Sequence, residues 1–286
     1  MILLTGATGN VGFEIARILD QQGVTAKALV RSPAAAEKLA GFSHIIPVEG
    51  DLDDAASVAA ALEGVETAFL LTRSSERAEA QQLGFVTAAK AAGIRHIVKF
   101  SQVHADAASP VRFLRYHAAV EAAIKASGLS YTFLRANLFM QELLAFGETI
   151  RQQGNIFAPV GDGAVSLVDV RDLAAVAVAA LTQPGHDGKS YDLTGPEALT
   201  HDEIARQIGT VLGREVGYVD IAPEQMRQVL RDYHFPDWQA DGVIEDYAHY
   251  ARGEAAGISG DIEKVTGRKA RSLGVFLGDY ADRLRG

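Results

Sequence analysis

The sequence predicts an α/β protein built on a doubly wound parallel β-sheet, followed by a smaller C-terminal α/β lobe. Two observations lead to this fold class. Over the first half of the chain, apolar runs of strand length alternate with helical segments of about a dozen residues, which is typical of βαβ units. In addition, a glycine-rich turn joins the first strand directly to the first helix.

That turn is the segment TGATGNVG, residues 5–12. The apolar run at 1–4 has the length of a buried strand. Apolar side chains then recur at helical spacing, at Val11, Ile15, Ile18 and Leu19. Glycines at the junction allow another group to approach the main chain, and the positive end of the helix dipole favours an anion there. The pattern favours a pyrophosphate site, although an ordinary glycine turn has the same composition.

The remaining elements of the first domain follow in regular order. The further strands are predicted at 24–30, 44–52, 65–72, 94–101 and 129–136. The helices between them are predicted at 54–62, 80–93 and 116–127. We expect a dinucleotide-binding core of Rossmann type over 1–140, completed by about 163–195.

Beyond residue 140 the rhythm of the sequence changes. The segment 163–181 is interpreted as a short strand followed by a helix, with Asp169 or Asp172 as its cap. Later elements are a strand at 189–195, a helix at 200–213, a strand at 215–221 and a helix at 223–233. Thr200 and Glu203 have the spacing of a capping box. Residues 141–286 are expected to form most of a substrate-binding lobe that is interleaved with the core.

Composition excludes several classes of protein. The net charge of −9 disfavours a nucleic-acid surface, which needs clustered Lys and Arg. The chain contains no Cys, so disulfides, thiol nucleophiles and Cys-zinc sites are excluded, and we expect no metal site. The longest apolar run, 173–181, is too short to cross a bilayer, and a basic leader is not evident. A cytoplasmic protein without a membrane partner is expected.

Several segments together resemble a known family. They are GATGNVG, LVRSP with Arg31, EGDLDD, LRANLFMQE and LVDVRDLAAVA. This set is similar to the NmrA-like branch of the atypical short-chain dehydrogenase/reductases, near the bacterial NAD(P)H quinone oxidoreductases and triphenylmethane reductases. The resemblance covers nearly the whole chain and implies a Rossmann-type fold and hydride transfer from a nicotinamide cofactor.

The resemblance also implies which residues bind the cofactor. The expected cofactor-binding residues are Gly6, Ala7, Thr8, Gly9, Asn10, Val11, Gly12, Arg31, Ser32, Asp51, Leu52, Leu71, Thr72, Ser101 and Asn137. Arg31 follows the second strand where an acidic residue would select NAD, and a guanidinium there suits the 2′-phosphate of NADP. NADP(H) is therefore the expected cofactor, with a solvated loop arginine as the alternative interpretation.

The sequence departs from the wider superfamily at its usual proton donor. Tyr116 occupies the place of the tyrosine in Tyr-x-x-x-Lys, but Val120 stands where the lysine is expected. Without a cation there, nothing evident lowers a phenol pKa that is ordinarily near 10. Tyr116 is thus a candidate for the catalytic acid without an evident group to tune its pKa. His117 and His104 could shuttle protons, although a loop or surface histidine needs no function, and the sequence does not say whether Lys99 in the fifth strand faces the cofactor or solvent.

A missing acid constrains the substrate. Hydride addition to a ketone gives a strongly basic alkoxide, whereas addition to a quinone gives a phenolate-like anion that water can protonate. Cationic dyes need no proton at the accepting carbon. Catalysis then consists of holding the reactants together. Phe139, Met140 and Phe235 are the expected substrate residues, although an aromatic cluster in the lobe is also typical of a core.

Three functions remain open at this stage. The first is an NADPH-dependent reductase of a quinone or similar conjugated aromatic acceptor. The second is a non-catalytic NADP-binding redox sensor that regulates a partner. The third is a reductase dedicated to one polycyclic aromatic biosynthetic intermediate. A homodimer is the expected assembly if the chain associates.

Overall fold

The structure is a computed structural model that describes residues 1–285, and these residues group into two compact units. Unit 1 comprises Met1–Ser109, Leu114–Arg135 and Leu173–Asp192. Unit 2 comprises Pro110–Phe113, Ala136–Asp172 and the chain from Leu193 onward. The two units are described separately.

Unit 1 contains a seven-stranded sheet in the order β3-β2-β1-β4-β5-β6-β8. Its strands are β1 (Ile2–Leu4), β2 (Ala26–Val30), β3 (Ile45–Glu49), β4 (Thr67–Leu70), β5 (His96–Gln102), β6 (Ser130–Ala136) and β8 (Lys189–Leu193). The pairs from β3 across to β5 are all parallel. From β1 the chain builds outward to β3 and then returns to β4 on the other side of β1. The junction of β1 and β4 is therefore the switch point, where such sheets bind ligands beyond the strands' carboxyl ends.

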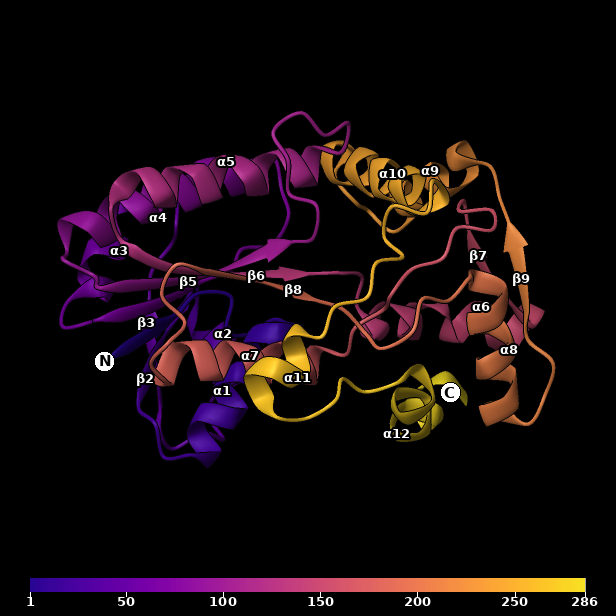
Figure 1. Cartoon of the computed structure of the whole chain (residues 1–286), viewed down its shortest axis with the longest axis horizontal. Coiled ribbons are helices and arrows are strands. Elements are labelled where there is room, and N and C mark those ends of the chain that lie inside the picture. Colours follow the sequence, from indigo (N-terminus) through magenta and orange to yellow (C-terminus); the bar gives the residue numbers. More distant parts are fainter. Residues whose placement is uncertain (286) are drawn as a thin grey trace. The chain divides into compact units, whose positions relative to one another are not determined.

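Helices cover both faces of this sheet. They are α1 (Asn10–Gln21), α2 (Pro33–Glu37), α3 (Ala55–Leu62), α4 (Ala78–Ala91), α5 (Arg112–Ser127) and α7 (Val170–Thr182). Helices α3, α4 and α5 lie on one face, and α1 and α7 lie on the other (Figure 1). The α4 side buries an apolar cluster that includes Phe85, Val120 and Phe133. Strands buried on both faces explain the continuous apolar runs in the sequence.

Unit 2 is built on a smaller core. A parallel pair of strands, β7 (Asn155–Ala158) and β9 (Gly217–Asp220), packs with several helices. The helices are η1 (Met140–Phe146, 3₁₀), α6 (Gly147–Gln153), α8 (His201–Leu212), α9 (Pro223–Asp232), α10 (Asp237–Ala251), α11 (Asp261–Thr266) and α12 (Leu273–Arg285). Its core includes Ile156, Ile204 and Phe276, all fully buried.

Most predicted elements are present, but the prediction of a strand at the start of 163–181 is wrong. Val165, Ser166 and Val168 donate their N–H groups to Leu199, Ala255 and Leu138, respectively. Because successive residues bond to three different segments, no continuous ladder forms and only isolated bridges remain. The helix that follows does form, and Asp169 caps it by accepting from the Arg171 N–H at 2.9 Å.

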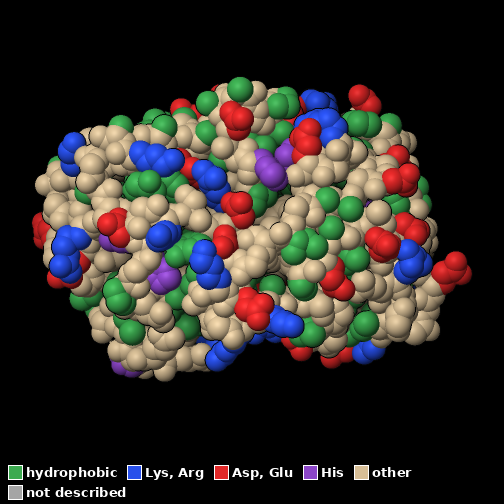
Figure 2. All heavy atoms as spheres, viewed as in Figure 1, with side chains coloured by type: hydrophobic (Ala, Val, Ile, Leu, Met, Phe, Trp, Pro, Cys, Tyr) green, Lys and Arg blue, Asp and Glu red, His purple; other side chains and the backbone are tan. Residues whose placement is uncertain are grey.

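On the face drawn in Figure 2, basic and acidic side chains are interspersed, and no large area carries charge of a single sign. Within residues 1–285, no helix combines the length and apolar character needed to span a membrane.

Candidate functional site

The glycine turn lies between β1 and α1, at the switch point of the sheet. Gly6 has a φ of +67°, which side chains other than glycine rarely adopt, and its carbonyl accepts from the Gly9 N–H at 3.1 Å. A Cβ built on Gly12 would lie 2.1 Å from the Gly6 carbonyl oxygen. Gly6 is therefore required by the backbone and Gly12 by the close packing of α1 on the turn.

Gly9 differs from both of its neighbours in the motif. Its φ of −89° and ψ of 174° are extended values that any residue adopts. A Cβ there would meet the Gly6 oxygen at 3.5 Å, an ordinary contact, and the residue is exposed. Nothing within the described fold requires a glycine at this position. An approaching ligand that needs the space above the main chain does explain it.

The N-terminus of α1 is suited to an anion. The first turn of a helix leaves backbone N–H groups without intrahelical partners. No side chain caps this end of α1, and its first turn carries no acidic residue. Amide groups and the helix dipole therefore remain available for a phosphate group. The glycine cradle and the helix end together fit the pyrophosphate of a dinucleotide.

The ends of β1 and β4 are tied together beside this turn. The Thr5 hydroxyl donates to the Leu71 carbonyl at 2.8 Å, and the Leu71 N–H contacts the same hydroxyl at 2.8 Å. Thr72 follows, and its Oγ1 lies 2.6 Å from Nε2 of the buried Gln82. Leu71 and Thr72, both expected beside the cofactor, are thus fixed at the switch point while remaining partly exposed.

Arg31 stands immediately after β2, exposed to solvent. Among residues 1–285 no hydrogen bond or ion pair engages its guanidinium. Ser32, also expected at the cofactor, caps α2 instead, because its hydroxyl accepts from the Ala35 N–H at 3.3 Å. Arg31 is therefore the free cation at this strand end, and Ser32 positions the helix that follows it.

The residues after β3 form a hydrogen-bonded turn. The Asp51 carboxylate accepts from the Asp53 N–H at 3.0 Å, and the Asp51 N–H donates to the Ser57 hydroxyl at 3.0 Å. Leu52 is half-buried and packs against the apolar cluster on the α4 side. The main-chain path at this strand end is thereby held in place.

Ser101 lies at the carboxyl end of β5 and is 1% exposed. Its hydroxyl donates to Glu121 at 2.7 Å, and Glu121 also accepts two hydrogen bonds from Arg135. Arg135 has a raised pKa because of this carboxylate. The described contacts of Ser101 therefore serve to anchor β5 to α5.

Tyr116 is buried on α5, and its hydroxyl lies 3.1 Å from the Ser74 hydroxyl in the loop after β4. Val120, one turn further along, is fully buried in the apolar cluster on the α4 side. No cation could occupy that place without losing its hydration. The structure thus explains physically why the usual Tyr-x-x-x-Lys pair does not form here.

The expected substrate residues all belong to unit 2. Phe139 is half-buried at the start of η1, where its backbone pairs with Val168. Met140 is 1% exposed and packs in the core of this unit, so it offers no surface to a ligand. Phe235 is half-buried in the turn between α9 and α10.

Asn137 has its side chain fully engaged within unit 2. Its amide donates to the Ser166 hydroxyl and the Ala255 carbonyl, both at 2.8 Å, and its oxygen accepts from the Leu138 N–H. These bonds join three separate segments of the unit. They give Asn137 a positioning role that the sequence did not indicate.

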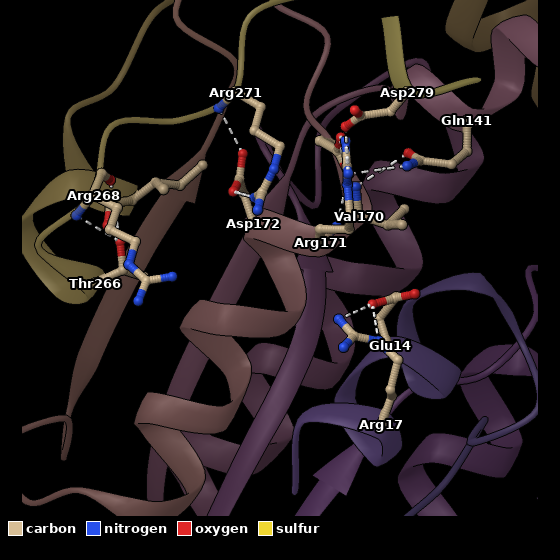
Figure 3. Close-up of polar contacts among 12 residues, drawn as sticks. Glu14, Arg17, Gln141, Val170, Arg171, Asp172, Thr266, Arg268, Arg271 and Asp279 are labelled. Carbon is tan, nitrogen blue, oxygen red and sulfur yellow. Dashed lines mark hydrogen bonds and ion pairs between the residues drawn. The ribbon is translucent and has the colours of Figure 1, made fainter. Parts of the chain in front are cut away.

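The VDVRDLA segment forms an ion-pair network (Figure 3). Arg171 pairs with Asp169 at 2.6 Å and with Asp279 at 2.7 Å. Burial opposes the charge on Asp169, but hydrogen bonds from Arg171 keep its pKa below the ordinary value. Asp172 turns toward Arg271, and burial raises the pKa of its carboxyl. The charges are internally satisfied, so we assign this segment to the stability of unit 2.

Sequence reasoning considered Lys99 and His117 for proton transfer but did not predict that they form one buried cluster in unit 1. Lys99 on β5 and His117 on α5 lie in contact beside Tyr116. Strand alternation places Lys99 on the same face as Ser101, two residues on, but does not identify the helix that covers it. Among residues 1–285, no group of three or more His, Asp or Glu side chains is arranged to hold a metal ion.

Comparison with known proteins agrees with this geometry. The model of the NmrA-like family matches residues 1–280. An NAD(P)H azoreductase of Xenophilus azovorans is 38% identical over 281 residues, covering 98% of each chain. The chain belongs to the NmrA-like family, which confirms the resemblance predicted from its motifs.

Solved structures of similar fold include complexes with the expected cofactor. The NADPH-dependent quinone oxidoreductase of Escherichia coli, solved with NADPH, superposes with a TM-score of 0.89 at 29% identity, covering 98% of this chain and 100% of the other. The triphenylmethane reductase of Citrobacter sp., solved with NADP(H), gives a TM-score of 0.87 at 27% identity and covers 97% and 100%. The predicted Rossmann-type fold class is confirmed.

Proposed function

We propose that this protein is an NADPH-dependent oxidoreductase that transfers hydride to a quinone or a similarly conjugated aromatic acceptor. The observation that carries the proposal is Gly9, an exposed glycine that the fold does not require, at the uncapped end of α1. The names of the similar proteins support the acceptor class, because they include an azoreductase, a quinone oxidoreductase and a reductase of triphenylmethane dyes.

The dinucleotide is held by unit 1. Gly9 and the first amide groups of α1 would receive its pyrophosphate, and the free guanidinium of Arg31 would receive the 2′-phosphate of NADPH. Leu71 and Thr72 would border the rest of the dinucleotide at the switch point between β1 and β4. When bound, the cofactor supplies a hydride, and the chain contributes binding, orientation and protection from water.

The residues around Tyr116 favour an acceptor whose reduction does not depend on this phenol as a strong acid. Val120 rules out the usual neighbouring cation on α5, and the Tyr116 hydroxyl is engaged with Ser74. Hydride addition to a quinone gives a phenolate-like anion, which is a far weaker base than the alkoxide of a simple ketone. Conjugated acceptors therefore suit this site better than alcohols or ketones.

Phe139 and Phe235 remain the substrate residues in this proposal. Phe139 and Phe235 are half-buried aromatic side chains, suited to cover a flat aromatic ring. Substitution of either by Ala should raise KM for a conjugated acceptor while leaving the Kd for NADPH unchanged. Met140 is excluded from this role because its side chain is in the core.

A screen of electron acceptors tests the function. Consumption of NADPH is followed with menadione, an azo dye and a cationic triphenylmethane dye, with Gly9→Val as the matched control that should not bind cofactor. Turnover with several acceptors supports the proposal. Tight binding of NADPH without any turnover would instead favour the sensor. Turnover confined to one polycyclic aromatic compound would favour the dedicated biosynthetic reductase.

We also propose a cytoplasmic location and a homodimeric assembly. The absence of cysteine agrees with a protein that does not depend on disulfides. Fractionation of cells that produce the full chain tests the location, and sedimentation equilibrium of the purified protein tests the assembly.

A further inference from the structure

A lysine and a histidine form a buried pair in unit 1. The Lys99 Nζ lies 2.8 Å from the His117 Nδ1 and donates to the Phe100 carbonyl at 2.6 Å. Lys99 is completely buried, whereas His117 keeps 8% of its surface exposed. We refer to these two residues as the Lys99–His117 dyad. Burial of a lysine without a direct carboxylate partner is costly and calls for an explanation.

The contacts of the dyad match a neutral amine. An uncharged lysine has two N–H donors, and it has two acceptors here, the Phe100 carbonyl and the His117 Nδ1. A charged ammonium carries a third donor. Since Nδ1 accepts from Lys99, the ring proton of neutral His117 is assigned to Nε2. Lys99 thus holds a lone pair that can take up one proton, and the imidazole can pass that proton on.

Neighbouring charges do not neutralise the dyad. Glu121 faces it from α5, but both of its oxygens are bound by Arg135 from β6, and one also accepts from Ser101. Burial lowers the pKa of Lys99 to about 7, although Glu121 opposes this shift. Burial, with Lys99 nearby, also holds the pKa of His117 well below its ordinary value. A proton therefore binds mainly at Lys99 and exchanges near neutral pH.

The dyad lies beside Tyr116, which occupies the position of the usual proton donor. The imidazole of His117 lies against the ring of Tyr116 in a tilted arrangement, with centroids 4.1 Å apart, and the Tyr116 hydroxyl lies 3.1 Å from the Ser74 hydroxyl in the loop that follows Thr72. Because Lys99 is fully buried, exchange of its proton with the surroundings passes through the partly exposed His117. The pair can therefore hold a proton on Lys99 and pass it on through His117.

We propose that the Lys99–His117 dyad delivers the proton that completes reduction of a quinone or azo acceptor. This inference rests on the proposed function. Hydride addition gives the acceptor two electrons and one hydrogen, leaving it with one negative charge. Starting from the ammonium form of Lys99, His117 gives its Nε2 proton to that anion and takes a proton at Nδ1 from the ammonium, which leaves Lys99 as the neutral amine. After product release, a proton from water returns through His117 and restores the ammonium of Lys99.

Two acceptors that differ in proton demand test the proposal. Reduction of a quinone takes up a hydride and a proton, whereas a cationic triphenylmethane dye takes up a hydride alone. Lys99→Met should lower kcat with menadione at least tenfold more than kcat with the dye, because general acids contribute about 10²- to 10⁴-fold. The fall of the wild-type quinone rate above neutral pH should disappear in the variant. Equal losses with both acceptors, or an unchanged pH profile, would overturn the proposal.

Matched variants separate this effect from a structural one. Lys27 on β2 also donates to backbone carbonyls, those of Ala61 and Glu63, and Lys27→Met should leave the ratio of the two activities unchanged. If Lys99→Met does not fold, His117→Phe keeps a ring against Tyr116 and removes both nitrogens. It should produce the same selective loss with menadione.

A titration without turnover gives an independent readout. In the full chain labelled with ¹³C-lysine, one Cε resonance should titrate near neutral pH and should be missing in Lys99→Met. A Lys99 resonance that titrates only near pH 10 would refute the dyad. If no acceptor is reduced but Lys99 titrates near neutrality, the proposed function fails while the proton-binding property of the pair stands.

Discussion

Gly9→Val should abolish NADPH binding in a protein that remains folded. The backbone of Gly9 has φ −89° and ψ 174°, which valine adopts without strain. The nearest atom to a Cβ there is the Gly6 oxygen at 3.5 Å, so the substitution meets no internal obstacle. The added methyl groups instead occupy the space above the first turn of α1, where the pyrophosphate would approach the amide groups.

The two expected effects differ greatly in size. Replacing a glycine at compatible angles stabilises a protein by about 0.4–1 kcal/mol. Losing a favourable N-cap residue costs about 1 kcal/mol, so the net change in unfolding free energy should be within about 1 kcal/mol of zero. Affinity for NADPH should fall at least a hundredfold, which corresponds to about 2.8 kcal/mol.

Fluorescence titration with NADPH and urea unfolding measure the two quantities on the same preparations. Gly12→Ala is the contrasting variant, because its Cβ would lie 2.1 Å from the Gly6 oxygen and must displace main chain. It should lose about 1–3 kcal/mol of stability. The reasoning is refuted if folded Gly9→Val binds NADPH as tightly as the wild type.

Three further predictions concern single side chains. Arg31→Ala should weaken NADPH at least tenfold and leave NADH nearly unchanged; equal losses measured by titration would remove the 2′-phosphate assignment. Because Lys99 titrates at about 7 when folded and near 10.5 when unfolded, the unfolded chain binds more protons between these values. Unfolding free energy should therefore rise with pH across that window, and Lys99→Met should flatten the slope in urea titrations. Tyr116→Phe should lose less than about tenfold in kcat with a quinone, whereas a hundredfold loss with normal NADPH binding would identify Tyr116 as the proton donor.

Local patterns in the sequence were the most informative. The capping box at Thr200 forms as predicted, with the Glu203 N–H donating to the threonine hydroxyl at 3.2 Å and the Glu203 carboxylate accepting from the Thr200 N–H. Its signal lies within four consecutive residues. The glycine turn was predictable for the same reason, since strand, turn and helix are adjacent in the chain.

Patterns that depend on distant partners were less informative. Residues 163–169 have the apolar character of a strand, but their N–H groups find partners in segments as far away as Ala255. Helix α10 was not predicted at all. Its Gly242 is a poor helix former, yet a Cβ there would meet the Phe113 ring at 2.3 Å, and Arg112 pairs with Glu245 of the same helix at 2.7 Å. Tertiary contacts thus decide this helix more than its intrinsic propensity does.

The Lys99–His117 dyad depends both on a local strand pattern and on a distant helix. It also bears on Val120, which stands where the wider superfamily has a lysine. The sequence left open whether Lys99 faces the cofactor or solvent, and the structure shows that it faces α5 instead. Val120 on that helix is buried among apolar side chains, so a lysine there would lack hydration, whereas β5 brings an amine to His117 next to Tyr116. If the dyad supplies the proton, Tyr116 needs only its ring to support the imidazole. Phenylalanine should then replace Tyr116 at small cost, while methionine at Lys99 should not, although His117 contacts both residues. With a quinone, a small loss of activity in Tyr116→Phe and a large loss in Lys99→Met would indicate proton delivery by the dyad. The reverse result would indicate proton donation by the phenol.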